Sequence, residues 1–310
     1  MVQVWRCSGL RWTAQGPVLE WDGGRRSALG WGQRVAFGVG SGGGRRCVGA
    51  RGHECPVRAA VSGRSTGARC EECARLDRAH SVAADTLADD PRPYHVYLAW
   101  FGPGMVKVGI TAVGRGPARL LEQGAVCFSW LGVGPLMAAR RAEELLRAAL
   151  GVPDRIPYAQ KRAVRAVLPG SEGERAAEIA ELHERAVALG GWPESLTRLP
   201  FRAEDHVRAF GLAGLVGADA FGEVTELVAG GVVSGELKAA AGPDLHLGTG
   251  GGVVVLDTRL MTGWGLVPVS VPVSVSVSLP VPVPGGSVGG EVSVPVREFT
   301  REAHQQDGLF

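Results

Sequence analysis

Lysine is nearly absent from this 310-residue sequence: only Lys107, Lys161 and Lys238 occur among 33 basic residues, and the other 30 are arginine. A guanidinium group presents paired donors that fit phosphate oxygens better than a lysine ammonium does. A GC-rich genome also produces an excess of arginine. The ratio is therefore compatible with phosphate binding but does not by itself demonstrate it.

The C-terminal part of the chain also lacks a net positive charge. Residues 1–94 hold 14 basic and 9 acidic side chains (net +5), residues 95–170 hold 10 and 4 (net +6), and residues 171–310 hold 9 and 18 (net −9). A bias in codon usage does not segregate the two signs. We therefore expect residues 1–170 to carry the surface that meets an anionic partner.

Two further absences bear on location. The first residues, Met1 to Cys7, contain no continuous apolar core of the kind that a secretory signal requires. No charged residue occurs from Leu260 to Gly290, but five prolines in this stretch would remove helix hydrogen bonds that a bilayer cannot replace. We expect a cytoplasmic protein without a membrane-spanning segment, with a low-complexity Val/Pro/Ser tail over residues 268–310.

Two short apolar runs, residues 95–101 and 105–110, predict a β-hairpin. Both are rich in β-branched and aromatic residues, and Gly102-Pro103-Gly104 between them continues neither strand. Tyr97 and Lys107 would then lie on neighbouring strands. A short helix from Ala118 to Gln123 would present Arg119 beside them.

The tripeptides His95-Val96-Tyr97 and Lys107-Val108-Gly109, followed by the Arg119 helix, resemble the core of the GIY-YIG endonuclease superfamily. A closer resemblance is to a bacterial domain family of unknown function. In that family a cysteine cluster precedes a tyrosine-containing strand, a Lys-Val-Gly-Ile-Thr segment and an Arg-x-x-x-Gln-Gly-Ala helix end. This chain continues in that order with Arg119, Gln123, Gly124 and Ala125, and the resemblance covers roughly residues 45–165.

The GIY-YIG resemblance implies a site for a phosphodiester. In that superfamily a tyrosine assists the attacking water, an arginine stabilises transition-state charge, and a glutamate holds one divalent ion such as magnesium or manganese. By position Tyr97 matches the first tyrosine, Lys107 the second, and Arg119 the arginine, with Arg115 a less well-placed alternative. His95 stands where the motif has glycine and could act as a base. The exchanges at Lys107 and His95 leave cleavage and mere binding both open.

Helical phase selects the glutamate. A helix is expected from about Pro135 to Gly151, and its apolar arc contains Ala139, Ala142, Leu146, Ala149 and Leu150. Glu143 falls at the edge of this arc, whereas Glu144 points away among arginines. We expect Glu143 to be the metal ligand; an ordinary ion pair with Arg147 is the alternative.

Four cysteines predict a structural zinc site. Cys47, Cys55, Cys70 and Cys73 are spaced C-x7-C-x14-C-x2-C in a stretch too polar to form its own apolar core. The last pair has the spacing that tetrahedral zinc prefers, and metal binding could supply the folding free energy. The seven residues between the first two exceed the usual spacing, so His53 is an alternative to Cys47. Without export signals, disulfides are disfavoured.

The predicted fold is α+β: a small antiparallel sheet with flanking helices, joined to the cysteine module and to β-rich terminal segments. With 45% hydrophobic residues the chain can bury a core. The segments we distinguish are 1–46 (β-rich), 47–93 (loop-like cysteine module), 94–168 (GIY-YIG-like core), 169–231 (helical), 232–267 (a second small β segment) and 268–310 (tail). A capping box, Ser171 to Glu174, predicts a helix start.

Two functional readings follow. The first is a zinc-containing nucleic-acid-binding protein whose GIY-YIG-like core acts as a divergent metal-dependent endonuclease on DNA or RNA. The second is a non-catalytic module built on the same core, which binds nucleic acid or has a regulatory or protein-interaction role.

Overall fold

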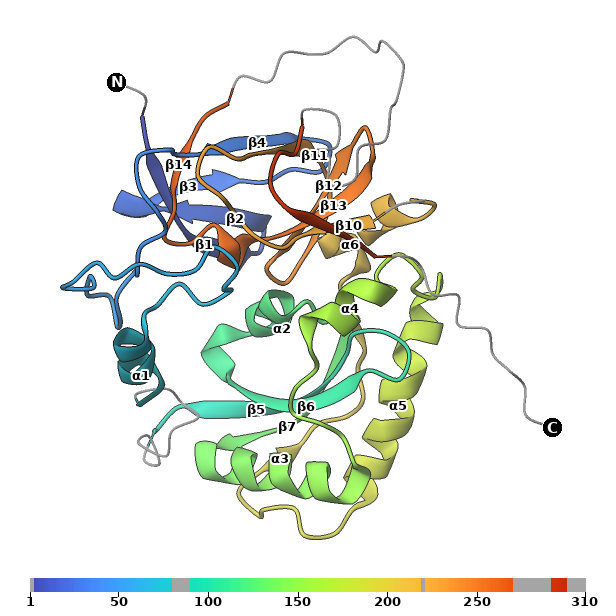
Figure 1. Ribbon diagram of the computed structural model, residues 1–310. Helices are drawn as coiled ribbons and strands as arrows, with labels where there is room; N and C mark the ends of the chain where they lie inside the picture. The colour runs from blue at the N-terminus through green and yellow to red at the C-terminus, as the bar shows by residue number, and fades with distance from the viewer. Residues whose placement is uncertain (1–2, 80–89, 219–220, 270–290, 300–310) are drawn as a thin grey trace.

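The computed structural model describes residues 3–79, 90–218, 221–269 and 291–299. Two β-sheets lie one above the other, and helices surround the lower sheet (Figure 1). The mixed α+β class predicted from the sequence is confirmed. The smaller sheet carries the hairpin motif, and the larger one combines strands from both ends of the chain.

The smaller sheet is built on the predicted hairpin. Strands β5 (Pro93–Trp100) and β6 (Val106–Ala112) pair antiparallel, with Tyr97 opposite Gly109 and Ala99 opposite Lys107. The other strands of this sheet are β7 (Cys127–Pro135), β8 (Thr197–Arg198) and β9 (Glu204–Asp205). The strand order is β6-β5-β7-β8, and β9 also pairs with β7. Strand β6 stands at the end of this order, and the loop after α3 meets its outer edge, where the Val108 N–H donates to the Pro153 carbonyl at 3.1 Å.

Helices cover both faces of this sheet. The short helices α2 (Ala118–Gln123) and α4 (Tyr158–Val164) lie above it, between the two sheets, and α3 (Leu136–Leu150) lies below (Figure 1). The long helix α5 (Glu172–Ala188) packs beside α3. The predicted end of α3 and the predicted start of α5 are confirmed. Gly151 caps α3 in a left-handed conformation with φ 66°, and the Ser171–Glu174 capping box starts α5.

The larger sheet corrects one expectation. Instead of two small terminal sheets, ten strands form one sheet in the order β15-β10-β13-β12-β11-β4-β14-β1-β2-β3. Its members are β1 (Trp5–Thr13), β2 (Gly16–Trp21), β3 (Arg25–Ala28), β4 (Arg34–Val39), β10 (Phe221–Val224), β11 (Val232–Ala241), β12 (Asp244–Thr249), β13 (Gly252–Asp257), β14 (Gly265–Val267) and β15 (Val296–Phe299). Strand β4 pairs with β11 on one side and β14 on the other. Each terminal segment thus satisfies backbone groups that the other would leave unpaired.

Two other expectations change in detail. The cysteine module, expected to be loop-like, contains helix α1 (Glu71–Ala79). Most of the expected Val/Pro/Ser tail lies outside the described residues, but β15 within it pairs antiparallel with β10. A last short helix, α6 (Val207–Phe210), precedes β10. Among the described residues no helix has the length and apolarity needed to cross a bilayer.

A buried ionic network joins the two sheets. Asp244 of β12 is fully buried and accepts from Arg162 at 2.6 Å and from Arg165 at 2.5 Å, both contributed by the region of α4. Arg162 also contacts Asp257 at 2.7 Å and pairs with Glu223. Burial alone would raise the pKa of Asp244, but the guanidinium groups of Arg165 and Arg162 hold it below its ordinary value. The charges therefore remain ionised within the joint.

The backbones of the two sheet layers also meet at two glycines. Gly124 ends α2 with φ 71°, and Gly242 turns the chain between β11 and β12 with φ 62°. A Cβ at Gly242 would lie 3.1 Å from the Gly124 nitrogen. Trp12 of β1 donates its indole N–H to the Gly242 carbonyl at 2.9 Å. The Gln-Gly-Ala end of α2 is thus the point where the core touches the larger sheet.

One arginine attaches the cysteine module to the larger sheet. Arg45 is 1% exposed, and its guanidinium donates to the carbonyls of Arg259 and Thr262, each at 2.8 Å, beside β14. It also donates to the carbonyls of Ser62, at 2.8 Å, and Ser65 within the module. A single buried side chain therefore satisfies acceptors from both parts.

We predict that Asp244→Asn destabilises the protein by about 3–5 kcal/mol, because it leaves Arg162 and Arg165 buried without their shared counter-ion. Urea unfolding followed by tryptophan fluorescence measures this change. Glu181→Gln is the matched control: Glu181 pairs with Arg185 at 3.8 Å on the surface of α5, and its loss should cost under about 1 kcal/mol. Equal effects of the two substitutions would contradict the account.

Candidate functional site

Tyr97 is packed between the neighbouring strand and α2. Its ring lies over Gly109, where an added Cβ would come within 2.4 Å of the Tyr97 Oη. The glycine of the Lys-Val-Gly segment is therefore required to admit the ring. Gln123 of α2 donates its side-chain N–H to the Tyr97 Oη at 3.0 Å. Tyr97 is only 1% exposed, and burial raises the pKa of its hydroxyl above the ordinary value.

Lys107 lies beside Tyr97 on the edge strand β6. Its Nζ is 5.8 Å from the centre of the Tyr97 ring and donates to the Asp154 carbonyl at 3.3 Å. Burial, together with the positive charge of Arg119, lowers the pKa of Lys107 to about 8, while the carboxylate of Glu143 acts in the opposite direction. The ammonium group is consequently close to its titration point at neutral to mildly alkaline pH.

Arg119 and Arg115 present exposed guanidinium groups near this lysine. Arg115 pairs with Glu122 at 2.6 Å, and Arg119 stands 3.9 Å from the same carboxylate. The charges of both arginines act on Tyr97, and that of Arg119 also acts on Lys107. Among the described residues, Glu122 is the acidic side chain that pairs with both arginines, so one negative charge faces two positive charges here.

Glu143 approaches the group from the other side of the sheet. It lies on α3, where Ala139, Ala142 and Leu146 of the predicted apolar arc are buried. The prediction was wrong at the end of the helix, where Ala149 is exposed. Glu143 is half-buried, whereas Glu144 is exposed. Burial raises the pKa of Glu143, and the charge of Lys107 opposes that rise. The carboxylate acts on Lys107 and Tyr97 electrostatically past the edge strand.

The alternative partner of Glu143 is engaged elsewhere. Arg147 lies 3.9 Å from Asp154, in the loop after α3. Its charge still lowers the pKa of Glu143. Asp154 thus links this arginine to Lys107, because the Asp154 carbonyl accepts from the lysine.

His95 stands apart from the charged residues. Its ring stacks on Trp130 of β7 with centroids 4.4 Å apart, and Trp130 in turn meets Tyr97 edge-on. Burial lowers the pKa of His95, which favours the neutral ring at neutral pH. The structure places His95 in an aromatic row on the Tyr97 face of the sheet.

Sequence reasoning missed two residues of this site. Gln123 was quoted only as part of a helix end, yet its side chain holds Tyr97. Lys161 of α4 is 4% exposed; its Nζ donates to the Gln123 carbonyl at 3.0 Å and lies 3.8 Å from the centre of the Phe101 ring. Burial lowers the pKa of Lys161 to about 7. The scarcity of lysine was the only signal in the sequence that could have singled it out.

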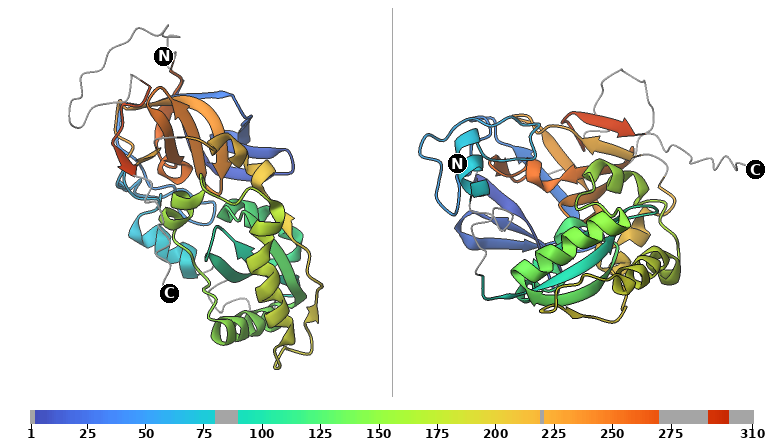
Figure 2. Two further views of the ribbon diagram at one scale, coloured as in Figure 1. Left: turned by 90° about the vertical axis from the view of Figure 1, so that its right-hand side faces the viewer. Right: turned by 90° about the horizontal axis from the view of Figure 1, so that it is seen from below.

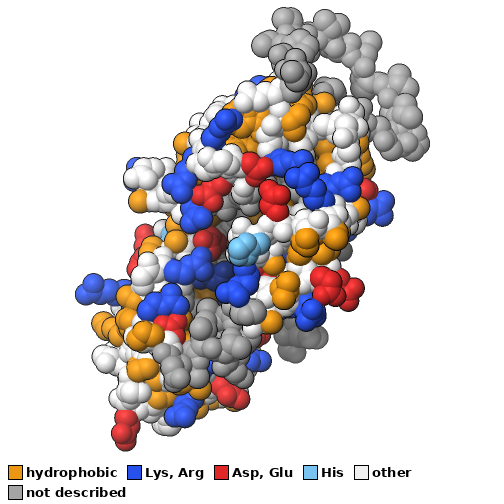
Figure 3. All heavy atoms as spheres, turned by 90° about the vertical axis from the view of Figure 1, so that its left-hand side faces the viewer, with side chains coloured by type: hydrophobic (Ala, Val, Ile, Leu, Met, Phe, Trp, Pro, Cys, Tyr) orange, Lys and Arg blue, Asp and Glu red, His pale blue; other side chains and the backbone are white. Residues whose placement is uncertain are grey.

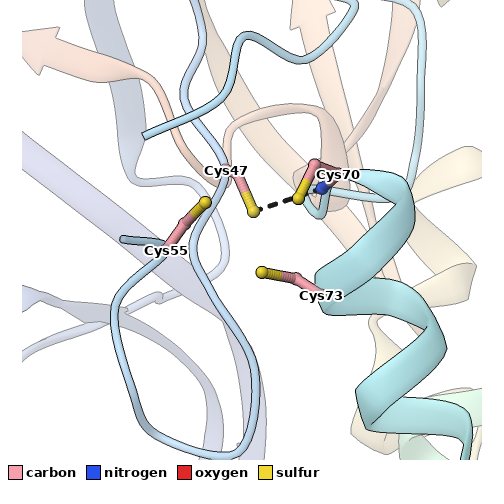
Figure 4. Close-up of side chains that lie close together, drawn as sticks. All are labelled: Cys47, Cys55, Cys70 and Cys73. Atoms are coloured by element: carbon pink, nitrogen blue, oxygen red, sulfur yellow. Dashed lines mark hydrogen bonds between the residues drawn. The ribbon is translucent and has the colours of Figure 1, made fainter. Parts of the chain in front are cut away.

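The four predicted cysteines converge on one point. Cys47, Cys55, Cys70 and Cys73 have sulfur atoms that all lie within 4.8 Å of one another (Figure 4). Tetrahedral zinc with Zn–S bonds of about 2.3 Å places its sulfurs about 3.8 Å apart, so the cluster fits such an ion. His53 does not belong to this group and is exposed. The choice of Cys47 over His53 agrees with this geometry, and all six cysteines of the chain are free of disulfides.

Backbone N–H groups point at the sulfurs as expected around thiolate ligands. Gly49 and Cys70 donate to the Cys47 sulfur at 3.3 and 3.2 Å. The N–H of Ala59 lowers the pKa of Cys55 to about 7, whereas burial raises that of Cys73 to about 12. A bound cation would deprotonate Cys73 as well. The donor set therefore suits a structural metal ion, and it contains no open acidic or histidine ligand that a catalytic site would use.

We predict one zinc ion per chain, lost on Cys70→Ser. Removing one thiolate leaves an incomplete tetrahedral site in a segment that has no other core. Elemental analysis of freshly purified protein measures the metal content. Cys7→Ala is the matched control, since Cys7 is a buried cysteine of β1 outside the cluster, and it should keep its zinc. Full zinc content in the Cys70→Ser protein would refute the assignment.

Comparison with known proteins identifies a family and nothing narrower. A family model described as "Protein of unknown function (DUF2797)" matches residues 34–266. The match begins with β4, ends in β14, and includes the four cysteines and every residue of the Tyr97 site. No curated protein and no solved structure was found to match. Because the family model covers well over half of the chain, the protein belongs to the DUF2797 family, as the resemblance to a domain of unknown function predicted.

Proposed function

We propose that this protein is a zinc-containing nucleic-acid-binding protein with a GIY-YIG-like core formed by β5, β6, α2, β7 and α3. The order of these elements, with a tyrosine on the first strand, an arginine on the first helix and a glutamate on the second, supports the comparison. The observation that carries the proposal is that Lys107 lies 5.8 Å from the Tyr97 ring, while Arg115 and Arg119 share one carboxylate of α2, the helix whose Gln123 binds the Tyr97 hydroxyl. Phosphate oxygens are the natural ligands of such a group.

Each residue then has a distinct role. Arg119 and Arg115 are exposed and lie at the start of α2, where they would contact the phosphate backbone directly. Lys107 is half-buried, so its charge would meet a phosphate in a less hydrated setting, where the interaction is stronger. Gln123 and Tyr97 hold α2 against the strands, and thereby fix the arginines relative to the lysine.

Binding is favoured over cleavage because of Tyr97. A residue that assists an attacking water must reach that water by a hydrogen bond. The Tyr97 hydroxyl is buried and already accepts from Gln123, and the pKa of Tyr97 is raised, so it is poorly suited to that role. His95, the other candidate base, stacks on Trp130.

A divergent endonuclease is the second candidate, and Glu143 is the observation in its favour. This carboxylate is half-buried, and its charge interacts with that of Lys107 although α3 lies on the face of the sheet opposite α2. A residue that holds magnesium or manganese near a phosphate would need such proximity. Incubation of single-stranded, duplex and branched DNA and RNA with the protein and either metal tests it. Cleavage that disappears in Glu143→Gln would establish the nuclease; absence of cleavage with intact binding supports the non-catalytic protein.

We predict that nucleic-acid binding weakens steeply with salt and that Arg119→Ala lowers the salt slope by about 0.9 for duplex DNA, because one phosphate contact and its released counter-ion are lost. Fluorescence anisotropy at several salt concentrations measures the slope. Arg185→Ala, which removes an exposed arginine from α5, should leave the slope unchanged. Binding that is indifferent to salt would contradict the proposal.

We predict that affinity falls by up to about tenfold as the pH rises from 7 to 9, because Lys107, with its pKa lowered to about 8, loses the proton that makes it a phosphate donor. A bound phosphate favours the charged form, so the midpoint should lie somewhat above pH 8. Lys107→Arg keeps its charge across this range and should show a flat profile. Identical pH profiles for the two proteins would exclude Lys107 from the contact.

A further inference from the structure

Two arginines of the cysteine module have an unusual backbone conformation. Across the described residues, the non-glycine positions with positive φ are Arg51, at 53°, and Arg58, at 44°. A side chain in this left-handed region costs roughly 1–2 kcal/mol, and glycine is the residue that adopts it freely. Both arginines therefore occupy positions where the backbone alone would favour glycine.

The loops that impose this conformation belong to the candidate metal site. Arg51 and Gly52 are the two central residues of a tight turn in which Ala50 and His53 exchange backbone hydrogen bonds of 3.0 and 2.9 Å. Such a turn needs positive φ at both central residues. It lies between Cys47 and Cys55. Arg58 ends the next turn, where its N–H donates to the Cys55 carbonyl at 3.1 Å.

Both guanidinium groups are available at the surface. The Arg58 side chain is 75% exposed, and its partner Glu54, 3.6 Å away, is itself 87% exposed; such a pair contributes little. Arg51 is exposed and makes no ion pair within the described part of the chain. Figure 3 shows the side of the molecule on which the cysteine module lies: Lys and Arg side chains occur over the middle of this face, with Asp and Glu side chains among them.

Other arginines of the module are more firmly engaged. Arg64 donates to Glu226 at 2.8 Å, and Arg75 pairs with Glu72 at 2.8 Å. Both lie outside the two left-handed turns. The unusual backbone is thus confined to two arginines that these stronger pairs do not engage, and it is set by turns that lie beside the metal-ligating cysteines.

We propose that Arg51 and Arg58 bind phosphates of a nucleic-acid strand, held in place by the metal-ligated loops of the cysteine module. This inference rests on the proposed nucleic-acid-binding function and assigns a second contact region to it. An arginine whose backbone is fixed by a turn loses less backbone freedom on binding than one on a flexible loop, and the paired donors of its guanidinium match phosphate oxygens. The competing explanation is that both arginines only offset the negative charge of a zinc ion with four thiolates.

The test compares two double variants of the full-length protein. The first, Arg51→Gly with Arg58→Gly, removes both guanidinium groups and also relieves the backbone. The second, Arg64→Ala with Arg75→Ala, removes the same charge from the module and is the matched control. Zinc content, thermal unfolding midpoint and anisotropy titrations of duplex DNA against salt are measured for both and for the unchanged protein.

We expect the glycine variant to keep its zinc and its unfolding midpoint, to bind at least tenfold more weakly, and to lower the salt slope by up to about 1.8, the value for two phosphate contacts. The control should change the slope far less. Equal slopes in the two variants, or loss of zinc from the glycine variant, overturn the inference. If the unchanged protein does not bind at all, the proposed function fails with it; if Arg119→Ala weakens binding and the glycine variant does not, only this inference fails.

Discussion

The attachment of helix α4 to the larger sheet depends on one buried carboxylate, Asp244, held between Arg162 and Arg165. Helix α4 carries these arginines on the side that meets the larger sheet, and the adjacent Lys161 reaches the opposite way to the Gln123 carbonyl at the end of α2. Helix α4 therefore connects α2 to the ten-stranded sheet, in addition to the direct approach of Gly124 to Gly242. Arg45 attaches the cysteine module to the larger sheet in a similar way, because its guanidinium donates hydrogen bonds to backbone carbonyls of the module and of the segment before β14. Both cationic regions are thus attached to the larger sheet through buried arginine side chains.

Burial makes Tyr97 a packing residue instead of the catalytic group that its place in the motif suggested. In sequence Tyr97 was a candidate catalytic group, but in the fold its ring fills the space above Gly109 and its hydroxyl is taken by Gln123. The Lys-Val-Gly segment therefore has a packing role: Gly109 leaves room for the Tyr97 ring, and Lys107 places a partly dehydrated charge beside that ring. A site built in this way is suited to hold a phosphate at its rim. It is less suited to deliver a proton to one, which is why binding is the function we favour.

The sequence predicted features that depend on neighbouring residues. The hairpin turn at Gly102 to Gly104, the end of α3 at Gly151, the capping box at Ser171 and the convergence of four cysteines all follow from local turn, capping or ligand chemistry. Pairing between distant strands could not be predicted, because periodicity identifies a strand but not its partner; β4 and β11 are nearly 200 residues apart. The same limit hid the ionic network, since Arg162 and Asp244 are separated by 82 residues. It also hid the burial of Tyr97, which depends on where α2 comes to rest.

Hydrogen–deuterium exchange of the zinc-loaded protein, with and without a saturating DNA or RNA ligand, tests the central claim most directly. Backbone amides exchange more slowly where a bound ligand suppresses local opening. We expect protection to be concentrated in residues 106–123, which contain Lys107, Arg115 and Arg119, and in the cysteine loops over residues 47–59, with little change in strands β10 to β13. Saturated binding that protects only the larger sheet, and leaves the hairpin and the cysteine loops unaltered, would contradict the account.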